Sequence, residues 1–142
     1  MKQVAFHFGL PKTGSSTLQV FFARNREALL LQGCDYLLLG EFAEGAAGMI
    51  SSGNGAYLAR CLFPRGSDAR VEDPGPQFRA FFAAIAASTA ATGLVSSELF
   101  AHTDLSLLRG LLTMVRDQGL RPTLFYFIRA QDQFLMSNYI QM

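Results

Sequence analysis

A lysine, two glycines and a run of hydroxyl residues lie close together near the start of the chain. The segment runs Phe8-Gly9-Leu10-Pro11-Lys12-Thr13-Gly14-Ser15-Ser16-Thr17. It follows an apolar run that is typical of a buried strand and precedes a helical pattern. Backbone N–H groups at a helix start, aided by the helix dipole, bind anions. Because the segment also offers glycines, hydroxyls and one positive charge, it predicts a phosphate-binding strand–loop–helix turn.

The loop differs from the loop that binds nucleoside triphosphates, whose pattern is G-x-x-x-x-G-K-[ST]. Gly9 and Gly14 have that spacing, but Ser15 stands where the pattern has its lysine, and the lysine of this chain is Lys12. The carboxylate that would hold magnesium at the end of another strand is also missing, since the clearest predicted strand ends at Arg129. The sequence therefore argues against an ATPase or kinase and predicts no metal.

Charged residues also follow two other predicted strands. Glu98 comes after a short strand over 93–96, and Arg129 comes after a strand over 121–128. Ligands of open parallel α/β sheets bind at the carboxyl ends of the strands. We therefore expect Lys12, Glu98 and Arg129 to face one crevice.

Two motifs resemble those of a known enzyme family. The run Pro11-Lys12-Thr13-Gly14-Ser15-Ser16-Thr17-Leu18-Gln19 resembles the 5′-phosphosulfate loop of sulfotransferases that use 3′-phosphoadenosine 5′-phosphosulfate (PAPS) as donor. The second motif of that family is an arginine after a strand, a serine eight residues on and then an aromatic residue, and Arg129, Ser137 and Tyr139 match it. The match is weak through 40–92. The chain is thus similar to the N-terminal portion of a PAPS-dependent sulfotransferase domain.

This resemblance implies a reaction and a role for each matched residue. A sulfuryl group would pass from PAPS, the co-substrate, to a hydroxyl or amine of a carbohydrate or small-metabolite acceptor. Lys12 would stabilise the bridging oxygen, and Arg129 and Ser137 would bind the 3′-phosphate. The 5′-phosphate would be held by Thr13, Gly14, Ser15, Ser16 and Thr17. Since a sulfuryl group carries less charge than a terminal phosphoryl group, a lysine and backbone amides can act without a divalent metal.

A base should also take the acceptor's proton, and its pKa would need to be raised toward neutrality. Glu98 is the candidate, because Ser96-Ser97-Glu98 resembles the segment that carries a glutamate base in several carbohydrate sulfotransferases. His7 and His102 are the rivals. The alternative for Glu98 is a surface or helix-capping carboxylate.

Simpler interpretations of the same residues stay open. Lys12 fits a solvated lysine in a Gly/Ser turn, and Arg129 fits a surface arginine paired with Asp132. Gly53-Asn54-Gly55 fits a plain turn as well as a lining of the acceptor cleft. Two other functions also remain. One is a P-loop kinase that uses ATP, and the other is a non-catalytic, truncated nucleotide-binding or partner-binding module.

The elements that must position these residues alternate along the chain. We expect strands over 3–8, 35–39, 93–96 and 121–128, and helices over 15–32, 55–62, 77–91 and 104–118, with a last helix from about Gln131. Residues 40–55 and 64–76 are expected as loops, and the pairs Phe21-Phe22 and Phe81-Phe82 as core. This alternation predicts a parallel sheet with helices on both faces. The expected fold is one three-layer α/β/α domain over 1–142, of the P-loop nucleoside-triphosphate-hydrolase-like kind.

Composition narrows the classes of partner and compartment. The chain has 142 residues, 50% of them hydrophobic, and a formal net charge of +1. This charge provides no field for nucleic acid or an anionic membrane, and we expect no nucleic-acid partner. No apolar stretch approaches the roughly 20 residues of a membrane span. The isolated Cys34 and Cys61 predict reduced thiols and a cytoplasmic protein. The chain stops inside its last predicted helix, so we expect a fragment of a longer protein.

Overall fold

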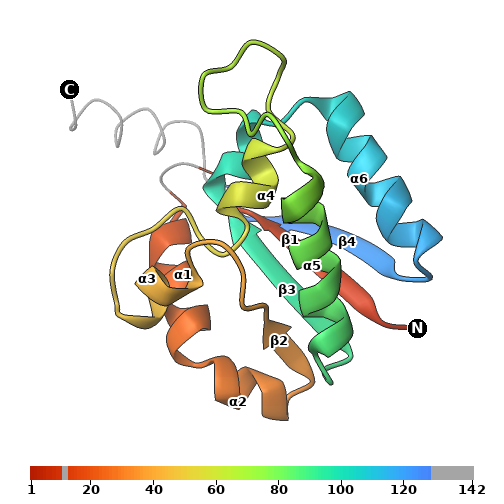
Figure 1. Ribbon diagram of the computed structural model, residues 1–142. Helices are drawn as coiled ribbons and strands as arrows, with labels where there is room; N and C mark the ends of the chain where they lie inside the picture. Colours follow the sequence, from red (N-terminus) through yellow and green to blue (C-terminus); the bar gives the residue numbers. More distant parts are fainter. Residues whose placement is uncertain (11–12, 129–142) are drawn as a thin grey trace, which may run out of the picture.

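The computed structural model describes residues 1–10 and 13–128. Strands alternate with helices along this part of the chain (Figure 1). The strands are β1 (Gln3–Phe8), β2 (Cys34–Tyr36), β3 (Thr92–Ser97) and β4 (Arg121–Tyr126). The helices are α1 (Ser15–Arg24), α2 (Arg26–Leu31), α3 (Phe42–Ala46), α4 (Ala56–Arg60), α5 (Gly75–Ala87), the 3-10 helix η1 (Glu98–His102) and α6 (Leu105–Asp117).

The strands form one four-stranded sheet in the order β2-β3-β1-β4, and all its pairs are parallel. Gln3 pairs with Thr92 on one side and with Arg121 on the other, so the carboxyl ends of three strands lie at one edge of the sheet. The central strand β1 is buried at four successive residues, Val4 to His7, as expected for a strand covered on both faces. The predicted α/β class with a parallel sheet is confirmed.

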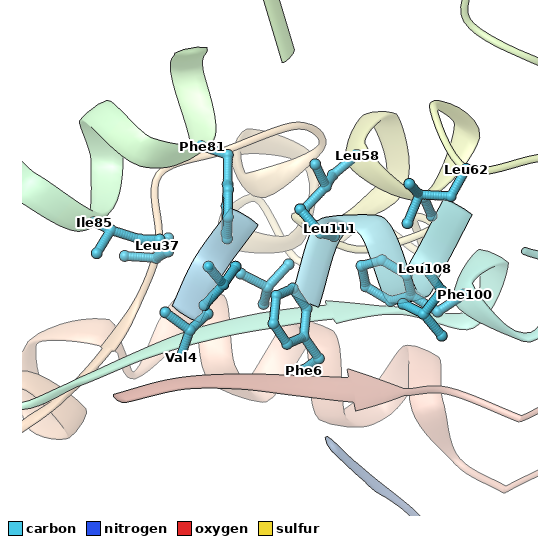
Figure 2. Close-up of a cluster of buried hydrophobic side chains, with 13 residues drawn as sticks. Val4, Phe6, Leu37, Leu58, Leu62, Phe81, Ile85, Phe100, Leu108 and Leu111 are labelled. Carbon is cyan, nitrogen blue, oxygen red and sulfur yellow. The ribbon is translucent and has the colours of Figure 1, made fainter. Parts of the chain in front are cut away.

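Alternate residues of the strands build the larger core on one face of the sheet. Val4 and Phe6 project from β1 toward Phe81 of α5 and Leu111 of α6 (Figure 2). Phe6 packs tilted against Phe81 at 5.9 Å between ring centroids and edge-on against Phe100 of η1, also at 5.9 Å. The predicted core position of Phe81 is thus confirmed.

The other strand residues build a smaller core with α1. Its buried members are Ala5, Ala23, Tyr36 and Leu94. The connection from β1 to β2 runs toward one edge of the sheet, while the connection from β3 to β4 runs toward the other. Since such crossovers are right-handed, they place α1 and α6 on opposite faces. Helices therefore cover both faces of the sheet.

The prediction of a single helix over 15–32 is wrong, because the helix is interrupted at Asn25. The backbone N–H and the side-chain Nδ2 of Asn25 both donate to the carbonyl of Phe21, at 3.0 and 2.8 Å. A side-chain amide that competes for a helix carbonyl ends the helix. The chain then restarts as α2, whose Arg26 pairs with Asp35 at 2.7 Å and donates from Nε to the Tyr36 carbonyl at 3.1 Å.

The buried face of α1 also differs from the expected apolar stripe. Ser15, Gln19 and Ala23 face the sheet, whereas Phe21 is 52% exposed and is not core. A small residue is needed at Ala23 because α3 approaches closely there. A Cβ placed on Gly45 would lie 3.1 Å from the Ala23 Cβ.

Some predicted boundaries shift as well. The strand expected over 35–39 is only β2, the loop expected over 40–55 contains α3, and the helix expected over 77–91 ends at Ala87. The helix predicted from Gln131 lies outside the described residues. None of the described helices is long and apolar enough to cross a membrane.

Candidate functional site

The strand order places the candidate crevice at the carboxyl ends of β1 and β3. These strands are neighbours, and the chain leaves them toward opposite faces of the sheet. Ligands of open α/β sheets bind where adjacent connections diverge in this way. The Gly9 N–H donates to the Ser97 carbonyl at 3.1 Å, and a Cβ on Gly9 would lie 3.2 Å from the Glu98 Cα. The structure thus brings Glu98 beside the loop that follows β1, as the sequence predicts.

Position 9 requires glycine because a side chain would not fit there, and not because of the backbone conformation. An added Cβ would also lie 2.7 Å from the Cβ and Oγ of Ser15. The first helical residue therefore folds back onto the end of β1. The Ser15 hydroxyl donates to the Leu10 carbonyl at 3.1 Å, and Thr13 Oγ1 donates to the same oxygen at 2.6 Å. These two hydroxyl hydrogens hold the loop together, and Ser15 is only 5% exposed.

The start of α1 offers backbone donors to a ligand. Gly14 has φ +79°, a left-handed conformation that favours glycine, and its carbonyl accepts from Leu18 N at 3.1 Å. No side chain of the described residues caps the first turn. Ser16 is half-buried and Thr17 is exposed. The first-turn amides and these two hydroxyls can therefore accept an anion.

Glu98 is half-buried and begins η1. It does not cap that helix, because the Ser97 side chain accepts from Leu99 N at 3.1 Å. It does not cap α6 either, since the Asp104 carboxylate accepts from Ser106 N and Leu107 N. The alternative of a helix-capping glutamate is thus wrong.

The rival histidines lie in two different environments. His102 is exposed at the far end of η1. His7 is fully buried, stacks on Phe125 at 5.0 Å and places Nδ1 2.8 Å from Ser96 Oγ. Burial lowers the pKa of His7 below its ordinary value, so its imidazole is neutral at pH 7.

This burial predicts a loss of stability at mildly acidic pH. The unfolded chain protonates His7 near its ordinary pKa of about 6.5, whereas the folded chain does so only at lower pH. Because the unfolded state then binds more protons, the free energy of unfolding falls as pH drops below that value. Urea titrations from pH 7.5 to 5 should show a smaller fall for His7→Asn than for the wild type. His102→Asn serves as the exposed control, and an equal fall in all three proteins would contradict the prediction.

A buried asparagine, which the sequence did not single out as structural, fastens the loop between α3 and α4 to the sheet. Asn54 Nδ2 donates to the carbonyls of Leu37 and Leu94 at 2.9 and 3.1 Å. Its Oδ1 accepts from Ser96 N at 2.8 Å, and its N–H donates to the Tyr36 hydroxyl at 3.1 Å. Asn54 thus joins β2 and β3 where β2 has ended. The interpretation of Gly53-Asn54-Gly55 as a plain turn is too simple.

The described residues carry little other reactive chemistry. Both cysteines are free thiols, and burial raises the pKa of Cys61 to about 11, so it is a poor nucleophile. Between residues 1 and 128, leaving out 11 and 12, no group of three or more His, Cys, Asp or Glu side chains could hold a metal. The predicted ligands Lys12, Arg129 and Ser137 lie outside the described residues.

The described part of the site therefore consists of uncapped helix amides, two accessible hydroxyls and Glu98, whose backbone lies beside the loop after β1. Such a site can bind an anionic group at the helix start and accept a proton next to it. Comparisons with protein-family models, with curated proteins and with solved structures give no match for this chain.

Proposed function

We propose that the chain is the nucleotide-binding part of a PAPS-dependent sulfotransferase. The observation that carries this proposal is the contact between the loop after β1 and Glu98. The uncapped start of α1 supplies donors for a 5′-phosphate, and the Glu98 backbone lies against Gly9 of the same loop. The P-loop-like class belongs to the same proposal. Its support is the parallel order β2-β3-β1-β4, with the loop following the internal strand β1.

In this proposal each group of residues has its own role in the sulfuryl transfer. When bound, PAPS supplies the sulfuryl group. The first-turn amides, Ser16 and Thr17 orient its 5′-phosphate, and Lys12 neutralises charge on the bridging oxygen. Arg129 and Ser137 bind the 3′-phosphate. Glu98 takes the proton of the attacking hydroxyl.

The Ser15 hydroxyl has a different role from that of Ser16 and Thr17. Because its hydrogen is used on the Leu10 carbonyl, Ser15 shapes the loop. Its backbone N–H remains at the helix start, where it can contribute to the anion site. The proposal therefore assigns the 5′-phosphate to the amides and to the two outer hydroxyls.

Calorimetric titration with 3′-phosphoadenosine 5′-phosphate tests the donor site. We expect binding that does not depend on magnesium. Lys12→Ala and Arg129→Ala should each weaken it by roughly 10- to 150-fold, because each removes a charged hydrogen bond worth roughly 1.5–3 kcal/mol. Glu98→Gln should bind as the wild type does, since its carboxylate serves the acceptor.

Arg116→Ala is the matched control, because Arg116 is exposed in the last turn of α6, away from the carboxyl ends of the strands. A folded protein that does not bind the nucleotide would exclude the donor site. Magnesium-dependent binding of ATP in its place would favour the kinase.

A further inference from the structure

A buried glutamine beside the candidate crevice has no partner in the fold. Gln19 is 1% exposed, and within residues 1–10 and 13–128 neither Oε1 nor Nε2 of its side chain has a hydrogen-bond partner. Buried polar side chains are hydrogen-bonded in the large majority of cases, and an exception calls for an explanation such as a bound water or ion, a catalytic role or strain. Nothing in the core of α1 requires a carboxamide here, since Ala23, one turn later, packs by apolar contact.

The Gln19 carboxamide lies at the carboxyl end of β3. A Cβ on Gly53 would be 2.9 Å from Gln19 Nε2 and 2.2 Å from the Ser96 carbonyl oxygen, so both groups border the same point. Gly53 borders the carboxamide, and the loop between α3 and α4 that contains Gly53 lies at the same end of the molecule as the start of α1 (Figure 1). The carboxamide is therefore close to the crevice that contains Glu98.

We propose that Gln19 is the buried end of a subsite for a neutral, hydroxyl-bearing small molecule, the acceptor of the transfer proposed above. A hydroxyl can donate to Oε1 and accept from Nε2, which a carboxylate or an ammonium cannot do. The half-buried Ser51 and Ser52 add further polar groups. Glu41 accepts from Ser52 N at 2.6 Å, so its carboxylate lies next to Gly53 and disfavours an anionic acceptor there. The Arg24 guanidinium lies at the other end of the loop, 3.6 Å from where a Cβ on Gly48 would stand. The inference rests on the proposed function for the identity of the acceptor only.

The acceptor reaches Gln19 when residues 48–52 are displaced, while Gly53 stays against β3 beside the anchored Asn54. Gly48 and Gly53 have φ +81° and +85°, and the loop between them exposes Met49 by 54% and Ile50 by 83%. Few buried apolar contacts therefore hold residues 48–52, and such segments open at low free-energy cost. Opening removes the cover from the carboxamide.

A titration of the labelled full chain with methyl glucoside, followed by ¹H–¹⁵N spectra, tests the subsite. We expect saturable shifts of the Gln19 side-chain NH₂ and of the Gly53 amide, and no such shifts with the anionic methyl glucuronide. Gln19→Met, which keeps the length and removes the polar atoms, should weaken glucoside binding at Gly53 by about tenfold. Gln118→Met, the same change on an exposed residue, should not alter it.

The melting temperature and nucleotide binding separate the outcomes. Gln19→Met should melt at the wild-type temperature or above, because it removes two unpaired buried groups, and it should bind 3′-phosphoadenosine 5′-phosphate unchanged. A melting temperature several degrees lower would make Gln19 a structural residue and overturn the subsite. If methyl glucoside leaves both signals unmoved while the nucleotide binds, the subsite is wrong and the donor site stands. If neither ligand binds, both proposals fail.

Discussion

Replacing Gly53 by alanine is expected to destabilise the protein by about 2–5 kcal/mol, the sum of a backbone and a steric cost. The residue has φ +85°, and its new Cβ would stand 2.2 Å from the Ser96 carbonyl oxygen. That oxygen cannot yield easily, because it belongs to β3 and accepts from Gly55 N at 3.0 Å. The free energy of unfolding from urea titration measures the loss.

Gly66 provides a matched control for this substitution. It has φ +87°, and a Cβ there would meet nothing within 4 Å. Gly66→Ala should therefore cost only the left-handed conformation, about 1–2 kcal/mol. The difference between the two variants isolates the collision at Ser96. Equal losses would show that the loop yields freely and that the close approach to β3 has no energetic weight.

Asn54→Ala is expected to cost about 3 kcal/mol, because it leaves the buried Ser96 N–H without a partner and removes two further hydrogen bonds. The Ser96 N–H loses its acceptor while it stays buried, whereas the Leu37 and Leu94 carbonyls keep backbone donors, Leu39 N and Leu37 N. Alanine is too short to replace the asparagine side chain, and the cavity adds to the loss. Chemical denaturation again measures the effect.

Asn25→Ala is the control for loss of an asparagine side chain. Asn25 is exposed, and its Nδ2 makes one hydrogen bond, to the Phe21 carbonyl. We expect a change of about 1 kcal/mol or less, since water can replace this bond. A loss at Asn54 no larger than at Asn25 would show that the network joining β2 to β3 contributes little.

The sequence predicted those helices and strands that are marked by apolar runs and by residues typical of helix ends. Gly33 and Gly119, both with positive φ, directly follow the helical segments predicted over 15–32 and 104–118, and Asp104, where the second of these segments was predicted to begin, caps α6. The juxtaposition of the loop after β1 with Glu98 also followed from the sequence, because parallel strands share one carboxyl edge. These features depend on local backbone chemistry and on sheet topology.

The sequence did not predict the roles of residues whose contacts lie far away along the chain. Asn54 contacts carbonyls 17 and 40 residues away, and no local propensity indicates such bonds. Gln19 is buried and Phe21 is exposed because α3 approaches α1 closely, and the sequence predicted a loop in place of α3. Tertiary packing overrides the apolar stripe of a helix in such cases. The convergence of Lys12 and Arg129 on the crevice stays a prediction.

The pairing of Arg26 with strand β2 has a consequence for self-association. The Arg26 guanidinium donates a hydrogen bond to the Tyr36 carbonyl. This carbonyl lies on the unpaired side of β2, which is only three residues long, so the β2 edge resists the addition of a foreign strand. The opposite edge differs. β4 spans six residues, with Leu124 44% exposed and Tyr126 60% exposed, and no strand of the described residues pairs with its outer side. Among the described strands, β4 is therefore the edge that a foreign strand could extend.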